Sequence, residues 1–510
     1  MLFSWILFII YVVVTFFLAW LGSKRTKSLD SFAIGNRDLN PWIVGITLAA
    51  SMTSTATFVI NPGIVYATGW SAIMGYGVSA GIGLISGIII LSKGFRRYGV
   101  VSAALTVPQW IGSRYQDRRL TLFYAVVSLF MIAMVVLICY AISGVLVATL
   151  NLPALFGAHS FEIALAITIL FVFTYIMFGG TYAHAYTNTA QGLIMIVVAV
   201  ALISTGIHLI GGGLLGALGD IDPNLAAVTN PNSILFRNYF EVFGANFVVG
   251  FALAVQPHFI TKSLYVKSDK DVNLYLVVTC VIGVLFSMVL LCGLFARIKE
   301  SDFITQFITA NKMGIDGVMP AYILKTFSPV VGALISLAIL AAGMSTLDGI
   351  LVALSAIFAN DIYLVLSEKR LRTYSQQEKL RIALKVGRYG LIGLGIVAYI
   401  ISLLQHHYKE FSVAIFAQEG VYALFAATFV PLLFGMFKRD VPKVPVFVAS
   451  VSALVIHFGF RYGKMTLATS ADYTNPGLTA TYGLLFSVLF MSMYLLGRAV
   501  FAGKFAEQPS

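Results

Sequence analysis

The sequence predicts an all-α integral membrane protein with about 13 transmembrane helices. Hydrophobic residues make up 59% of the 510 residues and charged residues only 11%, and the mean hydropathy is +0.91. A soluble domain carries about 25% charged residues, so this composition excludes an ordinary soluble protein. The apolar residues are gathered into runs, and most runs reach the roughly 20 residues that a helix needs to cross a bilayer.

These runs define the predicted helices along a single transmembrane domain that covers residues 1–510. No stretch between two runs is long enough to bury a core of its own, so we expect no soluble domain. The predicted spans are 3–22, 41–61, 71–92, 120–150, 160–178, 187–211, 242–262, 271–296, 320–362, 386–405, 412–437, 444–462 and 478–500.

The basic residues are distributed unevenly, and their positions predict the orientation of the chain. With the N-terminus outside and the spans alternating, most of the 33 lysines and arginines fall in cytoplasmic segments such as Lys24–Arg37, Lys93–Arg119 and Lys369–Arg388. This is the positive-inside pattern of a multi-pass protein. The net charge of +12 therefore sets orientation in a cell membrane and is not a nucleic-acid-binding surface. An odd helix count places the C-terminus in the cytoplasm.

Residues that carry enzyme chemistry form no recognisable pattern. The three cysteines, Cys139, Cys280 and Cys292, lie in apolar runs without CxxC spacing, and the seven histidines include no HExxH motif. No nucleophile–base pair is evident either. We therefore expect neither a zinc site nor an enzyme, and interpret the cysteines as small buried hydrophobic residues.

The span between Ile46 and Gly63 has an unusual composition for a membrane helix. Its centre is crowded with serine and threonine, and it ends in Asn61-Pro62-Gly63. An unpaired polar group costs several kcal/mol in hydrocarbon, so a polar, breakable span is tolerated where it lines a cavity. This pattern predicts a carrier.

A second interrupted span occurs five helices later, where Gln256-Pro257-His258 lies deep in the apolar run 249–262. Proline removes a hydrogen-bond donor and frees backbone carbonyls in the preceding turn. A simple proline kink is the alternative interpretation. Two broken spans in matching positions favour a carrier with inverted repeats and a binding site at the membrane midplane.

A third polar element, Ser345-Thr346, lies late in the predicted ninth helix. Such hydroxyls often bond back to a carbonyl of their own helix. Alternatively, two hydroxyls and the carbonyls of a broken helix supply the neutral oxygen ligands that a monovalent cation requires.

Several motifs occur together in an order that resembles the sodium:solute symporter family, which includes sodium/proline, pantothenate, sialic acid and sugar carriers. The resemblance extends from about residue 20 to residue 445 and implies the leucine-transporter fold. It implies two five-helix inverted repeats at 41–211 and 242–437. The motifs are Ala50–Gly63, Tyr66–Trp70, Thr106–Pro108 before Ser113–Tyr115, Gly179-Gly180, Gln191-Gly192, Gln256–His258, Ala342–Thr346 and Asp361–Tyr363.

The resemblance also implies a site for sodium as the coupling ion. Backbone carbonyls and two hydroxyls would form it, from Ala50, Thr53, Ala342, Ser345 and Thr346. Two positions depart from the family pattern. Asn188 replaces an acidic residue found in many members, and Met52 stands where some proline-type members carry aspartate. The core then lacks carboxylates for a second sodium or a proton relay, so we expect one coupled sodium.

The predicted solute contacts are polar residues of the two broken spans and of the third and eleventh helices, namely Ser54, Thr57, Tyr76, Gln256 and Gln418. We expect no buried lysine at this site, because Lys262 and Lys325 lie near span ends and can extend to the membrane surface. Val249 and Leu253 are aliphatic where proline-selective relatives are aromatic, which disfavours proline. The expected solute is a small polar organic molecule: a carboxylate, a vitamin-like acid or a sugar.

Two other functions stay open for this sequence. A proton-coupled symporter would have the same fold but normally needs a titratable residue near the cation site. A transporter-like solute sensor would usually carry a signalling domain. We expect the protein to work as a monomer, and a channel is disfavoured because no repeated filter motif is present.

Overall fold

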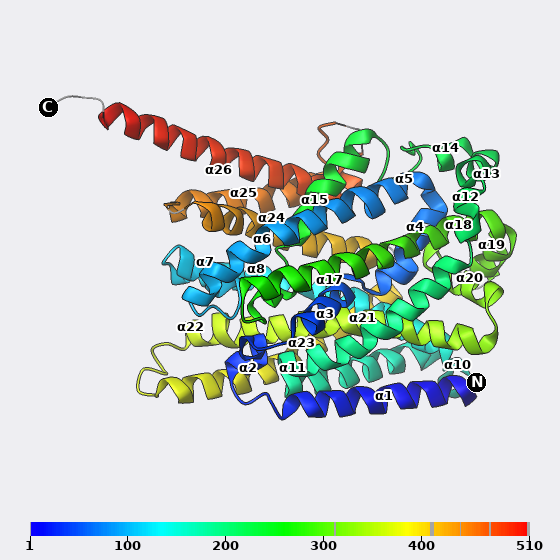
Figure 1. Ribbon diagram of the computed structural model, residues 1–510, viewed down its shortest axis with the longest axis horizontal. Helices are drawn as coiled ribbons and strands as arrows, with labels where there is room; N and C mark the ends of the chain where they lie inside the picture. The colour runs from blue at the N-terminus through cyan, green and yellow to red at the C-terminus, as the bar shows by residue number, and fades with distance from the viewer. Residues whose placement is uncertain (1, 311–312, 409–412, 439, 469–470, 507–510) are drawn as a thin grey trace.

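The computed structural model describes residues 2–310, 313–408, 413–438, 440–468 and 471–506, and within these ranges it is helical without a β-strand (Figure 1). Ten helices in these ranges are long and apolar enough to cross a membrane, and two bent helix pairs raise the number to 12. Helix α11 has 45 residues, with non-helical φ and ψ angles at Gly180. At 1.5 Å per residue it is about twice as long as a bilayer core is thick, so it counts as two spans. The resulting total of 13 agrees with the prediction.

The long helices lie side by side as a bundle, with α1 beginning at one end and α26 ending at the other (Figure 1). Their bounds are α1 Leu2–Ser23, α6 Gly81–Val101, α8 Arg118–Ser128, α9 Ile132–Thr149, α11 Ser160–Ser204, α17 Asp269–Ser287, α18 Leu291–Lys299, α21 Pro329–Ile357, α23 Gln376–His407, α24 Val413–Phe437, α25 Lys443–Tyr462 and α26 Pro476–Ala506.

Short helices connect and cap the long ones. They are α2 Leu29–Ile34, α5 Trp70–Ala72, α7 Val107–Arg114, α10 Pro153–Phe156, α12 Ile207–Gly211, α13 Leu214–Ile221, α14 Pro223–Ala226, α19 Ser301–Ala310, α20 Val318–Thr326 and α22 Leu364–Leu366. Short 3₁₀ or π segments used below are η2 Ala56–Ile60, η3 Ile73–Ala80, η6 Phe240–Ala245, η7 Thr261–Leu264, η10 Phe358–Tyr363 and η11 Asp472–Thr474.

Both predicted breaks are present. Helix α3 (Pro41–Met52) ends before Thr53, and the chain bends by 54° before it continues through η2 into α4 (Asn61–Thr68). Helix α15 (Asn246–Leu253) ends before Gln256, and a bend of 59° leads into α16 (Pro257–Ile260) and η7. Gln256 has φ −56° and ψ 134°, the extended conformation that a following proline favours.

Three predicted boundaries are wrong. The expected span 320–362 is two helices, because α20 ends at Thr326 and α21 starts at Pro329. The connection expected between 178 and 187 is helical apart from a kink at Gly180, and the expected span 187–211 ends at Ser204. Hydropathy does not detect the start of α21 at Pro329 or the end of α11 at Ser204, because each occurs within an apolar run. At 179–186 the apolar character falls, but the backbone stays helical.

Helix α21 lies at the centre of the bundle, and nearly all residues from Ala338 to Ile357 are buried. Small residues bring it close to the break in α3. A β-carbon at Gly343 would lie only 2.4 Å from Thr55 Oγ1. The hydroxyl-bearing turn of α21 is therefore held against the broken span.

Gly180→Ala is expected to lower the thermal stability of the purified protein in detergent. Gly180 has φ +53°, and an added β-carbon would lie 2.6 Å from the Phe32 ring. Backbone strain of this kind costs about 1–3 kcal/mol. Gly283→Ala in α17 is the control, because its β-carbon would meet no atom within 4 Å. Equal melting temperatures for the two variants would contradict the expectation.

Candidate functional site

The hydroxyls of Ser345 and Thr346 on α21 face the broken end of α3. Ser345 Oγ lies 2.9 Å from the carbonyl oxygen of Ala50 and 2.8 Å from that of Ala342, and its single O–H can donate to either. Thr346 Oγ1 lies 3.0 Å from the carbonyl of Ser51 and 3.5 Å from that of Ala342. Four of the five residues predicted for sodium are thus brought together, although they are separated by almost 300 positions in the chain.

Thr53, the fifth predicted residue, lies at the edge of this cluster. Its backbone N–H donates to the carbonyl of Ala50 over 3.1 Å, and its side chain is buried. The converging oxygens are neutral, and the described residues include no group of three His, Cys, Asp or Glu side chains placed to hold a metal. Neutral hard oxygens suit a monovalent cation better than a transition metal.

Asn188 on α11 reaches the same cluster from the other side. Its Nδ2 lies 3.0 Å from Ser51 Oγ and 3.0 Å from the carbonyl of Ser345. The amide therefore lies beside the ion cluster and supplies no negative charge.

The expectation that Lys262 extends to the membrane surface is wrong. Its side chain is 0% exposed, and Nζ donates to the carbonyl of Thr47 (2.7 Å) and to Ser51 Oγ (2.8 Å). The bend at Gln256 is the physical reason, since it places η7 against α3 instead of continuing the span. Lys325 is exposed as expected and lies over the Phe303 ring.

The expectation that the core is short of carboxylates is also incomplete, because it overlooked Asp348. This buried side chain, one turn from Ser345, accepts hydrogen bonds from Tyr175 and from Thr187 Oγ1 (3.1 Å). His184 is equally buried, and neither ring nitrogen has a hydrogen-bond partner among the described residues. The spacing Ser345 to Asp348 places both on one helix face and was the available sequence signal.

The predicted solute residues fall into two groups. Tyr76 and Gln418 line a cavity of only about 10 Å³, together with Val249 and other residues of η6, α15 and α24. This volume holds about one water molecule. Ser54, Thr57 and Gln256 lie at the two breaks and do not line this cavity. Ser54 Oγ accepts the N–H of Ala56 over 3.1 Å and so starts the second half of the broken span. The assignment of all five to a solute stays a prediction.

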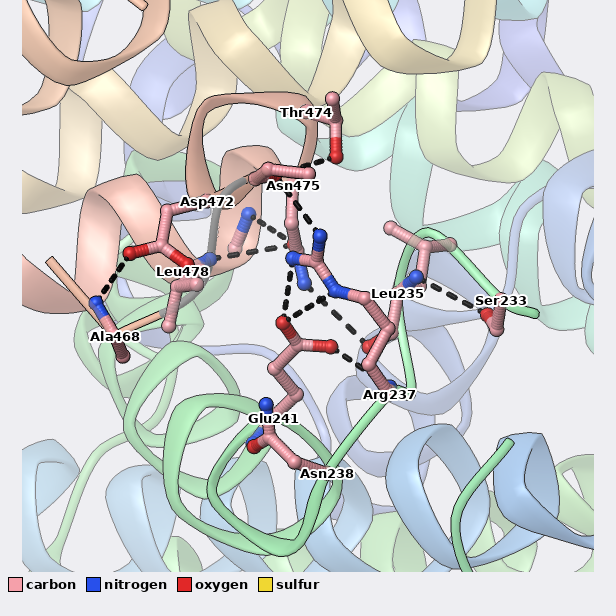
Figure 2. Close-up of polar contacts among 12 residues, drawn as sticks. Ser233, Leu235, Arg237, Asn238, Glu241, Ala468, Asp472, Thr474, Asn475 and Leu478 are labelled. Carbon is pink, nitrogen blue, oxygen red and sulfur yellow. Dashed lines mark hydrogen bonds and ion pairs between the residues drawn. The ribbon is translucent and has the colours of Figure 1, made fainter. Parts of the chain in front are cut away.

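A polar network that the sequence did not reveal lies beside this cavity (Figure 2). The Glu241 carboxylate is fully buried and pairs with Arg237, whose Nη1 donates to the carbonyl of Ala471 over 3.0 Å. Asn475 Nδ2 lies 3.4 Å from the carbonyl of Leu235. These bonds connect the chain before the second broken span with the segment that leads into α26.

The buried Glu419, next to Gln418, is paired as a membrane carboxylate must be. Arg461 Nε lies 2.5 Å from its carboxylate, and the Tyr462 hydroxyl donates to it over 2.8 Å.

A larger cavity of about 640 Å³ lies elsewhere, between α7, α8, η10 and α23. Asp361 lines it and accepts a hydrogen bond from Thr106 Oγ1 (2.6 Å), which joins two of the sequence motifs. None of the predicted solute residues lines this cavity.

Residues 32–450 match the model of the sodium:solute symporter family. The chain belongs to this family. It is therefore a multi-pass membrane protein and a sodium-coupled symporter with sodium as its coupling ion, and its family is one of transporters.

Curated relatives of this symporter are similar over most of its length. A sodium/pantothenate symporter of Haemophilus influenzae is 26% identical over 67% of this chain and 68% of its own. Sodium/proline symporter 2 of Staphylococcus saprophyticus is 25% identical over 89% of this chain and 85% of its own.

Solved structures support the fold. A Na⁺-coupled sialic acid symporter, captured in a substrate-bound outward-open state, superposes with a TM-score of 0.74 at 17% identity and covers 95% of this chain and 96% of its own. A nucleobase-cation-symport-1 family transporter superposes with a TM-score of 0.52 at 13% identity, and the match covers 91% of this chain and 94% of that transporter. These neighbours confirm the predicted leucine-transporter fold of the symporter.

Proposed function

We propose that the symporter binds one sodium ion where α3 breaks against α21 and uses it to import a small polar organic solute by alternating access. The observation that carries the ion site is the convergence of the Ser345 hydroxyl on the carbonyls of Ala50 and Ala342. Thr346 and Thr53 complete the proposed ligand set at the same turn. Carbonyls released by a broken helix serve the same purpose in other carriers of inverted-repeat design.

The solute is proposed to contact Ser54, Thr57, Tyr76, Gln256 and Gln418. Tyr76 and Gln418 line the same cavity, and their proximity, not the size of this cavity, supports two of these contacts. Aliphatic Val249 lines the same cavity, which supports a solute other than proline despite the proline-carrying relatives. The pantothenate relative supports a carboxylate or vitamin-like acid, and a sugar is the other class that these amides and hydroxyls suit.

The arrangement in the membrane is part of the same proposal. Residues 41–211 and 242–437 form the two inverted repeats, and the placement of both breaks in the first helix of each range supports this division. The N-terminus lies outside and the C-terminus in the cytoplasm of a cell membrane. The start of α1 at one end of the bundle and the end of α26 at the other (Figure 1) support an odd number of crossings. The protein works as a monomer.

Uptake of labelled solutes into proteoliposomes tests this function. A panel of monocarboxylates, pantothenate-like acids and sugars is offered with an inward sodium gradient, with the same gradient of choline, and with an inward proton gradient. We expect accumulation of one class with sodium alone, because the oxygens of the site are neutral.

The ratio of sodium to solute flux is expected to be one. Asn188 supplies no negative charge to the site, and the Asp348 oxygens already accept two hydroxyls. A flux ratio of two would contradict this expectation. Accumulation driven by protons without sodium would favour the proton-coupled alternative. Binding without accumulation would favour the solute sensor.

A further inference from the structure

Lys262 is a fully buried cation that the symport of sodium and solute leaves without a role. Its ammonium is bound by two oxygens of α3, the carbonyl of Thr47 at 2.7 Å and Ser51 Oγ at 2.8 Å. Helix α3 is also the element whose broken end carries Ala50. The ammonium of Lys262, a residue of η7, therefore contacts the helix that carries the proposed ligand Ala50, within about one turn of it.

Ser51 connects this ammonium with the ion site. Its Oγ accepts the bond from Lys262, while its carbonyl accepts the hydroxyl of Thr346 over 3.0 Å. Asn188 bridges the same two places, because its amide reaches both Ser51 Oγ and the carbonyl of Ser345. Two monovalent cations placed this close together repel each other strongly in a protein interior.

No carboxylate forms an ion pair with Lys262 in the part of the chain that the structure describes. Asp348 attracts it electrostatically, but the Asp348 oxygens accept hydroxyls of Tyr175 and Thr187. A buried charge without a paired counter-charge is costly, so the ammonium depends on the α3 oxygens.

The other titratable groups around Lys262 come from the helices that surround it. Helix α11 contributes His184 and α16 contributes His258, two imidazoles that burial keeps neutral. Helix α6 contributes Arg96, which donates to two backbone carbonyls near Lys262 and pairs with Asp269. Asp348 on α21 is the opposing charge. Helix α3 has no charged residue, and Asp30 of α2 is exposed to solvent. A sodium ion that binds near Ser51 would therefore be repelled by the Lys262 ammonium.

We propose that the Lys262 ammonium is a built-in monovalent cation that competes with sodium for the oxygen-lined space between α3 and α21. Sodium enters as the Lys262 amine releases one proton, so one positive charge replaces another and the charge of the site is constant. The proposal rests on the proposed ion site and adds a proton-binding site to it. Sodium and the proton are then linked antagonistically: each weakens the binding of the other by the same factor.

The test is calorimetric titration of the purified full-length protein with NaCl, at several pH values and at constant ionic strength maintained with choline chloride. The affinity of the wild-type protein for sodium is expected to rise with pH by up to about tenfold per pH unit, which is the limit when one proton is exchanged for each sodium. Buffers of different ionisation enthalpy should report about one proton released per sodium bound at low pH.

Two substitutions separate the charge of Lys262 from its size. Lys262→Met removes the charge and should bind sodium at least about tenfold more tightly than wild type at low pH, without pH dependence. Lys262→Arg retains a charge that cannot be released, so it should bind weakly at every pH. Lys325→Met, at an exposed lysine, is the matched control and should behave as wild type.

The proposal is overturned if wild type and Lys262→Met bind sodium equally at low pH while Ser345→Ala weakens binding. If Ser345→Ala also leaves sodium binding unchanged, the ion site itself is assigned wrongly, which is a separate failure. Should the Lys262 variants not fold, the wild-type titration decides alone. If wild type binds sodium without releasing protons and without pH dependence, the proposed exchange of sodium for the Lys262 proton is overturned.

Discussion

Ser345→Ala is expected to raise the sodium concentration for half-maximal uptake by roughly tenfold or more. The Ser345 hydroxyl touches the carbonyls of both Ala50 and Ala342, so its removal takes away the oxygen that joins α21 to the broken end of α3. The loss of one such ligand costs on the order of 1–3 kcal/mol. Thr346→Ala should act in the same direction but more weakly, because its contact with Ala342 is longer, at 3.5 Å. Uptake into proteoliposomes at varied sodium gives both values.

Ser355→Ala is the matched control for these two variants. Ser355 is a buried hydroxyl on the same helix, almost three turns beyond Ser345, and packs near Gly387 instead of α3. It should leave the sodium dependence unchanged. If Ser345→Ala and Ser355→Ala behave alike, the ion is held elsewhere.

The helices of this symporter were predictable because the bilayer imposes a length and a composition on every span. The two breaks were predictable for a related reason, since Pro257 and the hydroxyls after Ile46 are poorly compatible with a continuous helix in hydrocarbon. The boundaries that failed lie where apolar character and backbone conformation do not change together. The gap before Pro329 occurs inside a continuous apolar run, whereas the less apolar stretch 179–186 stays helical apart from the kink at Gly180.

The site was predictable only where local sequence carries the chemistry. The Ser345-Thr346 pair and the polar break at Thr53 are visible along the chain, and the structure brings their surroundings together. The contact of Lys262 with Ser51 spans 211 positions, and no spacing rule connects such distant residues. Hydropathy placed Lys262 at the end of a span, where a lysine usually reaches water. A bend that reverses this outcome depends on tertiary packing, and so does the pairing of Arg237 with the buried Glu241.

Gln418→Ala is expected to weaken solute binding by about tenfold, the effect of losing a buried polar contact with its partner left unpaired. Gln418 lines the cavity that also contains Tyr76, whereas Thr57 lies at the break outside it, so Thr57→Ala should have the smaller effect. Sodium binding measured without solute should change little in either variant. Equilibrium binding measurements with the transported solute and with sodium give the two dissociation constants separately. Gln377→Ala, at an exposed glutamine of α23, is the control.

The same two variants test how sodium and solute are coupled. Sodium is proposed to bind between Ala50 and Thr53, and Thr57 follows one turn later in the same broken span, where its N–H donates to the carbonyl of Ser54 over 2.9 Å. Sodium therefore orders the segment that the solute contacts, and each ligand should raise the affinity of the other by the same factor, typically worth about 1–3 kcal/mol. Thr57→Ala should reduce this factor because it lies between the two ligands, whereas Gln418→Ala, on α24, should preserve it. If both variants bind solute as wild type does, the solute pocket lies elsewhere in the bundle and the ion site alone stands.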